Sequence, residues 1–141
     1  MRFMMIVKAS KDYEAGKMPS ASLLAAMNRY NEELMKAGVL LDLAGLHPTS
    51  KGFKVRYTGG GQPTVIDGPF TESKELVGGY WIIQVRSREE ALEWARRAPA
   101  PHEGQDCEIE VRQILELSEF EPNEAVVQAR ELGKQLQNSV K

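Results

Sequence analysis

Apolar and polar residues alternate with two different periods along the chain, and each period predicts one kind of element. In residues 2–8 both alternating sets of side chains are apolar, which predicts a strand in the middle of a sheet. Residues 11–20 are polar and predict an exposed loop. In residues 23–37 apolar side chains recur every three to four positions, so we expect an amphipathic helix capped by Ser20 or Ser22.

A period of two predicts the remaining strands. These segments are rich in β-branched and aromatic residues and are separated by polar or glycine-rich stretches, which are typical of turns. They are residues 39–46, 53–58, 64–66, 78–85 and 107–112. The last strand is expected to have one polar face, formed by Glu108, Glu110 and Arg112.

Two further helices are indicated by their start signals. Ser87 and Glu90 match a capping box, in which each side chain accepts a hydrogen bond from an amide group near the other residue, and this predicts a helix to about Ala98. Pro122 opens a last segment with a helical apolar stripe. Its members are Ala125, Val126, Ala129, Leu132 and Leu136.

The order of these elements predicts the fold class. It runs strand, helix, two or three strands, helix, strand, with both helices on one face of an antiparallel sheet. This is the split strand-helix-strand arrangement called ferredoxin-like, of the α+β class. We expect one such domain over residues 1–121 and an added C-terminal helical tail over residues 122–141.

Composition and charge narrow the class of protein. The chain has 141 residues, of which 42% are hydrophobic and 27% charged, which is typical of a globular domain that is neither disordered nor inserted in a membrane. The net charge of −2, with no basic run, argues against nucleic acid as a partner. Lys8 ends the first apolar run without a cleavage site, so a signal peptide is not expected, and the single cysteine fits a reducing cytoplasm.

The segment Asp67-Gly68-Pro69-Phe70 combines a carboxylate, two residues with special backbones and an aromatic ring. One hypothesis is structural: the aspartate accepts hydrogen bonds from nearby amides, the glycine takes a special dihedral angle and the phenylalanine fills the core. The other is functional, with the Asp67 carboxylate held at the rim of a pocket to accept a hydrogen bond or a proton from a ligand. Both hypotheses can be true at the same time.

Several separated motifs occur in one order that resembles the DGPF, or YCII-related, proteins. They are Gly45–Gly52, Asp67–Phe70, Lys74–Glu75, Gly78–Ile83 and Ile109–Arg112. The resemblance covers roughly Met1 to Phe120 and implies a dimeric α+β barrel, in which two ferredoxin-like sheets pack across a two-fold axis. It also implies membership of a family whose biochemical role is mostly unassigned. The best-known relatives pair a histidine on the first helix with an aspartate, but residues 23–37 contain no histidine, so that dyad is not carried over.

Five polar residues are candidates for ligand binding. Lys74 and Glu75 follow the turn closely, and they either bind an anionic ligand or form a solvated ion pair. Tyr80 lies on a strand face of mixed polarity, as do Glu110 and Arg112 on the last strand. That face either lines a partly polar cavity between two subunits or forms a polar dimer interface.

Histidine and cysteine give few further candidates. His47 and His102 are isolated from clustered carboxylates, so no metal site is expected, and we expect no cofactor. His47 is a candidate general base, because histidine gains and loses a proton near neutral pH. Cys107 alternates with apolar positions and is predicted to be a small core residue and not a nucleophile.

These observations lead to two functional hypotheses. The first is a cytoplasmic homodimer that binds a small organic ligand between sheet and helices, with acid-base chemistry by Asp67 and His47. The alternative is a regulatory or interaction module without catalysis, since the resemblance implies a frequent gene neighbourhood beside alternative sigma factors. A bound ligand would favour the first, and a stable complex with another protein would favour the second.

Overall fold

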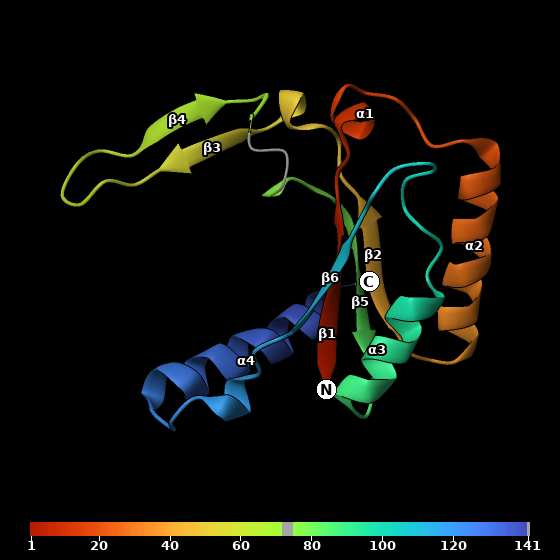
Figure 1. Ribbon diagram of the computed structural model, residues 1–141. Helices are drawn as coiled ribbons and strands as arrows, with labels where there is room; N and C mark the ends of the chain where they lie inside the picture. The colour runs from red at the N-terminus through yellow and green to blue at the C-terminus, as the bar shows by residue number, and fades with distance from the viewer. Residues whose placement is uncertain (72–74, 141) are drawn as a thin grey trace.

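A four-stranded antiparallel sheet forms the centre of the molecule, in the order β2-β5-β1-β6 (Figure 1). The computed structural model describes residues 1–71 and 75–140. The strands are β1 Arg2–Lys8, β5 Val77–Gln84, β2 Leu40–Gly45 and β6 Ile109–Gln113. β1 lies between two other strands, which confirms the interior position predicted from its two apolar faces.

Two helices cover one face of this sheet. α2 (Ala21–Lys36) begins at Ser20, whose hydroxyl accepts a hydrogen bond of 3.1 Å from the Leu23 amide. α3 (Arg88–Arg97) begins at Ser87. The predicted capping box of α3 is only half formed, because the Glu90 carboxylate accepts from the amide of the residue before Ser87.

The polar segment 11–20 was expected to be a loop throughout, but it contains α1 (Lys11–Glu14), a helix too short to produce an apolar period.

The core lies between this sheet face and the two helices. Side chains of alternate residues on β1 and β5 point toward α2 and α3, where they are shielded from water. The most deeply buried side chains are Met5, Leu34 and Ile83. Phe3, Tyr30, Val39, Trp81, Val85 and Ala91 complete the buried cluster. Hydrophobic burial therefore holds both helices against the same sheet face.

The order of the core elements is β1-α2-β2-β5-α3-β6, which is the ferredoxin-like α+β arrangement predicted from the sequence. A separate two-stranded hairpin, β3 (Phe53–Arg56) and β4 (Thr64–Asp67), is inserted between β2 and β5. It projects away from the main sheet (Figure 1). The period of two located these strands, but it did not show that they pair only with each other.

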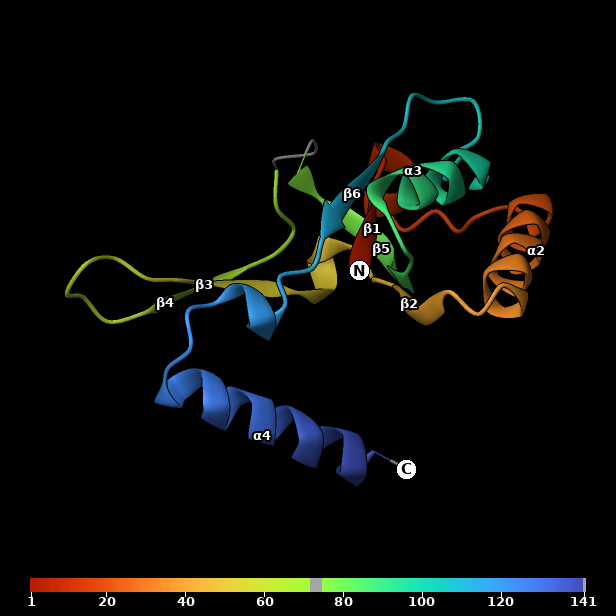
Figure 2. The same cartoon turned by 90° about the horizontal axis from the view of Figure 1, so that it is seen from below.

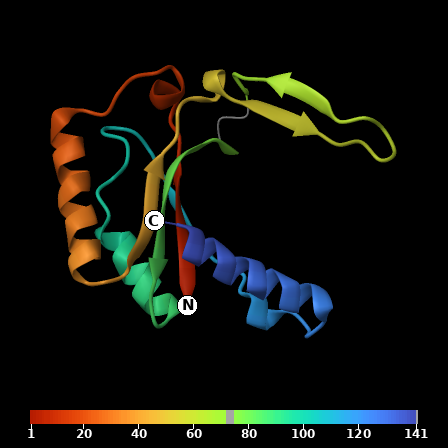
Figure 3. The same cartoon turned by 180° about the vertical axis from the view of Figure 1, so that it is seen from behind.

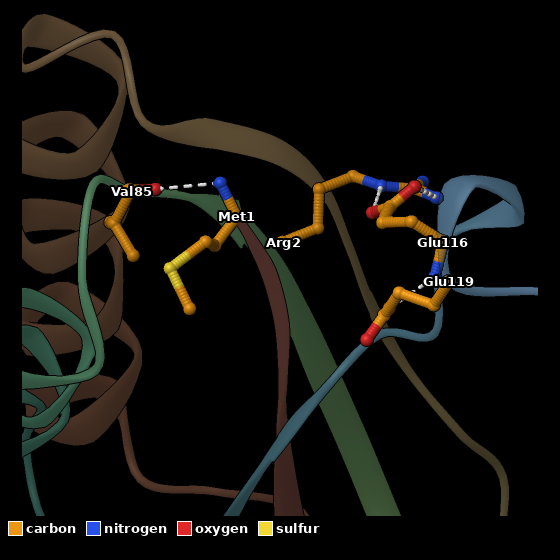
Figure 4. Close-up of polar contacts among 5 residues, drawn as sticks. All are labelled: Met1, Arg2, Val85, Glu116 and Glu119. Atoms are coloured by element: carbon orange, nitrogen blue, oxygen red, sulfur yellow. Dashed lines mark hydrogen bonds and ion pairs between the residues drawn. The ribbon is translucent and has the colours of Figure 1, made fainter.

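The start of β1 is tied to the end of β5 and to the segment that follows β6. The Met1 ammonium donates a hydrogen bond of 2.9 Å to the Val85 carbonyl, and the Arg2 guanidinium holds the Glu116 carboxylate at 2.8 and 3.1 Å (Figure 4). The hydrogen bond from Arg2 lowers the pKa of Glu116. Glu116 caps the short helix η3 (Leu117–Glu119), so this pair fixes the chain where it leaves β6.

The predicted tail helix is present as α4 (Glu124–Ser139), and its first turn is capped by Asn123. α4 lies on the opposite side of the sheet from α3 (Figures 2 and 3). None of its residues is buried, and Leu132 and Leu136 are 64% and 65% exposed.

Across the described residues, no helix combines the length and the apolar character needed to span a membrane.

Candidate functional site

A cavity of about 550 Å³ lies between α2 and the strands β2 and β5. Two segments border it, residues 10–20 before α2, which include α1, and residues 101–105 after α3. Much of its wall is apolar, formed by Val7, Met18, Leu23, Leu24, Met27, Leu43 and Trp81. Its polar lining residues include Asp12, Tyr13, Asn31, His102 and Glu103. A largely apolar cavity of this size with a few polar groups is typical of a small-molecule site.

Tyr13 joins the cavity to the ends of two strands. Its hydroxyl lies within hydrogen-bond reach of the Leu46 carbonyl and of the Gly78 carbonyl, the latter at 3.1 Å. A phenol has one hydrogen, so it donates to one of the two at a time. Burial raises the pKa of Tyr13, which keeps the hydroxyl protonated and able to donate.

His102 lines the same cavity. Its Nε2 lies 2.7 Å from the Lys8 carbonyl oxygen. A carbonyl can only accept a hydrogen bond, so Nε2 carries the hydrogen and Nδ1 of the neutral ring is left as an acceptor. The centres of the His102 and Tyr13 rings are 6.4 Å apart. The two side chains thus provide a proton acceptor and a hydroxyl group on one side of the cavity.

The rim of the cavity is held by hydrogen bonds between segments distant in sequence. The Glu103 carboxylate accepts from the Ser20 hydroxyl at the start of α2. The Asp12 carboxylate accepts a hydrogen bond of 2.7 Å from Gln105, and the Lys17 ammonium lies 3.8 Å from it. The loop of residues 101–105 is therefore attached both to α2 and to α1.

The inner wall is fixed by the aromatic core. The indole Nε1 of Trp81 donates a hydrogen bond of 2.7 Å to Oδ1 of Asn31. The Tyr30 ring packs edge-on against Trp81 at 5.4 Å, and its hydroxyl donates to the Trp94 carbonyl at 2.7 Å. Burial raises the pKa of Tyr30 to about 12. Trp81 is thus held between α2 and the sheet, with its indole N–H already satisfied by Asn31.

The two predicted catalytic residues lie outside this cavity wall. Asp67 ends β4 on the projecting hairpin, and His47 lies in the loop after β2. Both are exposed, and neither belongs to the described residues that line the cavity. His47 lies two residues after Gly45, which lines the cavity, and directly follows Leu46, whose carbonyl Tyr13 contacts. The roles assigned to Asp67 and His47 stay predictions.

The turn at residues 67–70 braces the loop that follows β2. The Gly68 amide donates to the Gly52 carbonyl at 2.9 Å, and the Phe70 amide donates to the Thr49 hydroxyl at 2.9 Å. The Thr49 amide in turn donates to the Glu14 carboxylate of α1 at 2.6 Å. Hydrogen bonds therefore connect the turn to the short helix that carries Tyr13.

Two parts of the structural hypothesis for this turn are wrong. Phe70 does not fill the core, because its ring is only half-buried and lies under the Lys54 ammonium at 4.2 Å. Gly68 does not have a positive φ. It is required because a β-carbon there would lie 1.7 Å from the Thr49 carbonyl oxygen. Among the described residues, no hydrogen bond to the Asp67 side chain is present.

Three predicted ligand-binding residues have polar partners on the helix-free face of the sheet. Glu110 and Arg112 pair in register with Ile6 and Met4, on the side away from α2 and α3. The Glu110 carboxylate lies 3.7 Å from Arg112. Tyr80 contributes to the cavity wall, but its hydroxyl donates to Asp42 at 3.2 Å, and the negative charge of Asp42 raises the pKa of Tyr80.

The other candidates are not brought into the cavity. Lys74 lies outside the described residues. Glu75 is exposed just before β5, and Cys107 is half-buried. Within the described ranges 1–71 and 75–140, no group of three or more histidine, cysteine or acidic side chains is placed to hold a metal ion.

Sequence reasoning did not assign ligand contacts to Tyr13 or Asn31, and it treated His102 only as an isolated loop residue. Asn31 did carry a signal. It follows Leu23 and Met27 at intervals of four, so a polar amide interrupts the apolar stripe of the helix. Tyr13 and His102 carried none, because only the folded chain places the two polar loops beside each other.

Comparison with known proteins agrees with the fold. The family model for the YCII-related domain matches residues 1–118, which leaves α4 beyond the matched region. An uncharacterized protein from Rhizobium meliloti (strain 1021) is 38% identical over 73 residues, or 52% of this chain and 56% of that relative. The chain thus spans little more than half the length of this relative. It belongs to the YCII-related domain family.

Proposed function

We propose that the chain binds a small, mainly apolar organic molecule in the cavity between α2 and the sheet. The observation that carries this proposal is the cavity itself, with a volume of about 550 Å³, an apolar wall and a few polar groups held in place by hydrogen bonds. Such a cavity gains binding free energy from apolar surface removed from water, and its polar groups orient the ligand.

A cavity-filling variant tests this proposal. Leu43 on β2 lines the cavity and is 40% exposed, so tryptophan there is expected to fill the cavity without disrupting the core. In a thermal-shift screen of metabolite mixtures, ligands that raise the Tm of the wild type should not raise that of Leu43→Trp. Leu41→Trp is the matched control, because Leu41 is on the same strand and 48% exposed but does not line the cavity. A screen without any stabilising ligand contradicts the proposal.

The proposal includes acid-base chemistry centred on His102. Nδ1 of its neutral ring can accept a proton from a bound ligand while Nε2 stays hydrogen-bonded to the Lys8 carbonyl. The Tyr13 hydroxyl, whose one hydrogen goes to the Leu46 or the Gly78 carbonyl, can still accept a hydrogen bond from that ligand through its oxygen. In this proposal His102 takes the role of base that was predicted for His47.

Substitution of His102 checks this role. His102→Gln removes the imidazole Nδ1 acceptor, so a ligand that donates to Nδ1 should bind more weakly to this variant than to the wild type. His47→Gln is the control and should bind the ligand as the wild type does. Calorimetry at neutral pH measures both affinities. If His102→Gln binds as tightly as the wild type, His102 is not the acceptor.

We further propose a homodimer formed through the helix-free face of the sheet. Met4, Ile6 and Ile82 on that face are partly exposed, and no helix of the described chain covers them. α4 lies on the same side with an exposed apolar stripe. A second copy presents the same helix-free sheet face and the same α4 stripe, so a two-fold dimer would bury both surfaces of each copy. A stable complex with another protein and none with a second copy would favour the interaction-module hypothesis.

A further inference from the structure

The side-chain amide of Asn31 has a fixed orientation in the cavity wall. An indole N–H can only donate, so the atom 2.7 Å from Trp81 Nε1 is the amide oxygen Oδ1. Both hydrogens of Nδ2 are then left without an acceptor among the described residues. Because Asn31 lines the cavity, Nδ2 is a donor available to a ligand there.

This donor lies far from His102 along α2. Glu103, the neighbour of His102, is hydrogen-bonded to Ser20 at the first turn of the helix. Asn31 follows eleven residues later, which corresponds to about 16 Å along a helix axis. The side chains of Leu24 and Met27 line the cavity between these positions. The polar groups thus lie toward opposite ends of an apolar space.

The charge of the wall restricts which acceptor fits Asn31. Among the described lining residues, Lys17 is the one side chain with a permanent positive charge, and it lies at the rim beside Asp12. A carboxylate bound at the Asn31 end would therefore lose its hydration without a nearby cation, which is costly. A neutral carbonyl, ester or ether oxygen needs only a hydrogen-bond donor.

We infer that Asn31 selects elongated apolar ligands with a neutral acceptor oxygen at one end and a hydroxyl or other proton-bearing group at the other. The acceptor oxygen receives a hydrogen bond from Asn31 Nδ2, and the proton-bearing group donates to His102 Nδ1. The inference deepens the proposed function and rests on binding in the same cavity.

Two probes that differ at one atom test the inference. They are ω-hydroxyoctyl methyl ketone and its methylene isostere, in which a CH2 group replaces the carbonyl oxygen. We expect the full-length wild type to bind the ketone about tenfold more tightly, as measured by calorimetry, because one extra hydrogen bond forms. Asn31→Asp keeps an acceptor for Trp81 but removes the donor, so it should lose this preference. Asn31→Leu should also lose it and provides a second variant if the aspartate lowers stability.

Asn28→Asp is the matched control. Asn28 is an exposed residue of α2 outside the cavity lining, so the same change there should keep the tenfold preference. Equal affinity of the wild type for both probes, or binding of neither, overturns the inference. Preference retained in both Asn31 variants overturns it as well. The metabolite screen with Leu43→Trp requires no ketone and tests cavity binding separately, so the two failures can be distinguished.

Discussion

Gly68→Ala is expected to lower stability by about 2 kcal/mol or more, which corresponds to a drop in Tm of roughly 6 °C or more. The added β-carbon would lie 1.7 Å from the Thr49 carbonyl oxygen and 2.6 Å from its carbonyl carbon. Both are backbone atoms, so no side-chain rotation relieves the overlap. The turn must move away from the loop and lose the hydrogen bonds from Gly68 and Phe70, at about 1 kcal/mol each.

The control for this effect is Gly59→Ala. A β-carbon at Gly59 has no atom of the described residues within 4 Å, and Gly59 does not have a positive φ, so the change should shift Tm little. Thermal unfolding followed by circular dichroism measures both variants. If Gly68→Ala unfolds at the wild-type temperature, the turn does not brace the loop after β2, and the close approach at Thr49 has no structural role.

Leu136→Lys is expected to weaken the proposed homodimer about a hundredfold. The apolar stripe of α4 continues beyond the part of the helix that contacts η3. Leu136 is 65% exposed in the single chain. An isolated helix of this length is marginal in water, so burial of the stripe must stabilise it. Burial of one leucine contributes about 1.5 kcal/mol or more, and a two-fold interface loses that contribution twice.

Val127→Lys is the matched control, because Val127 is also on α4 and 63% exposed but lies outside the stripe. Sedimentation velocity at micromolar concentration should show a dimer for the wild type and for Val127→Lys, and a monomer for Leu136→Lys. Removal of residues 123–141 should weaken the dimer and leave the ferredoxin-like core folded. A monomeric wild type contradicts the dimer, and a Leu136→Lys dimer as tight as the wild type contradicts the role of α4.

Most of the fold could be predicted from local patterns along the chain. Apolar periods are local properties. They located β1 and β5 through runs of apolar residues typical of strands, and α2 and α4 through one apolar stripe each. The side-chain caps at Ser20 and Ser87 could also be predicted, because a cap involves only residues that are neighbours in the sequence. The ordered motifs then pointed to the YCII-related family, which the family match confirms.

The residues of the candidate site could not be predicted in this way, because contacts between distant segments bring them together. Tyr13, Asn31 and His102 come from a four-residue helix, a long helix and a loop, and no local pattern relates their positions. The reason for Gly68 was equally hidden, because it depends on the backbone at Thr49. The sequence specifies which segments are buried. Which polar residues then share a cavity depends on how those segments pack, through contacts between residues far apart in the chain.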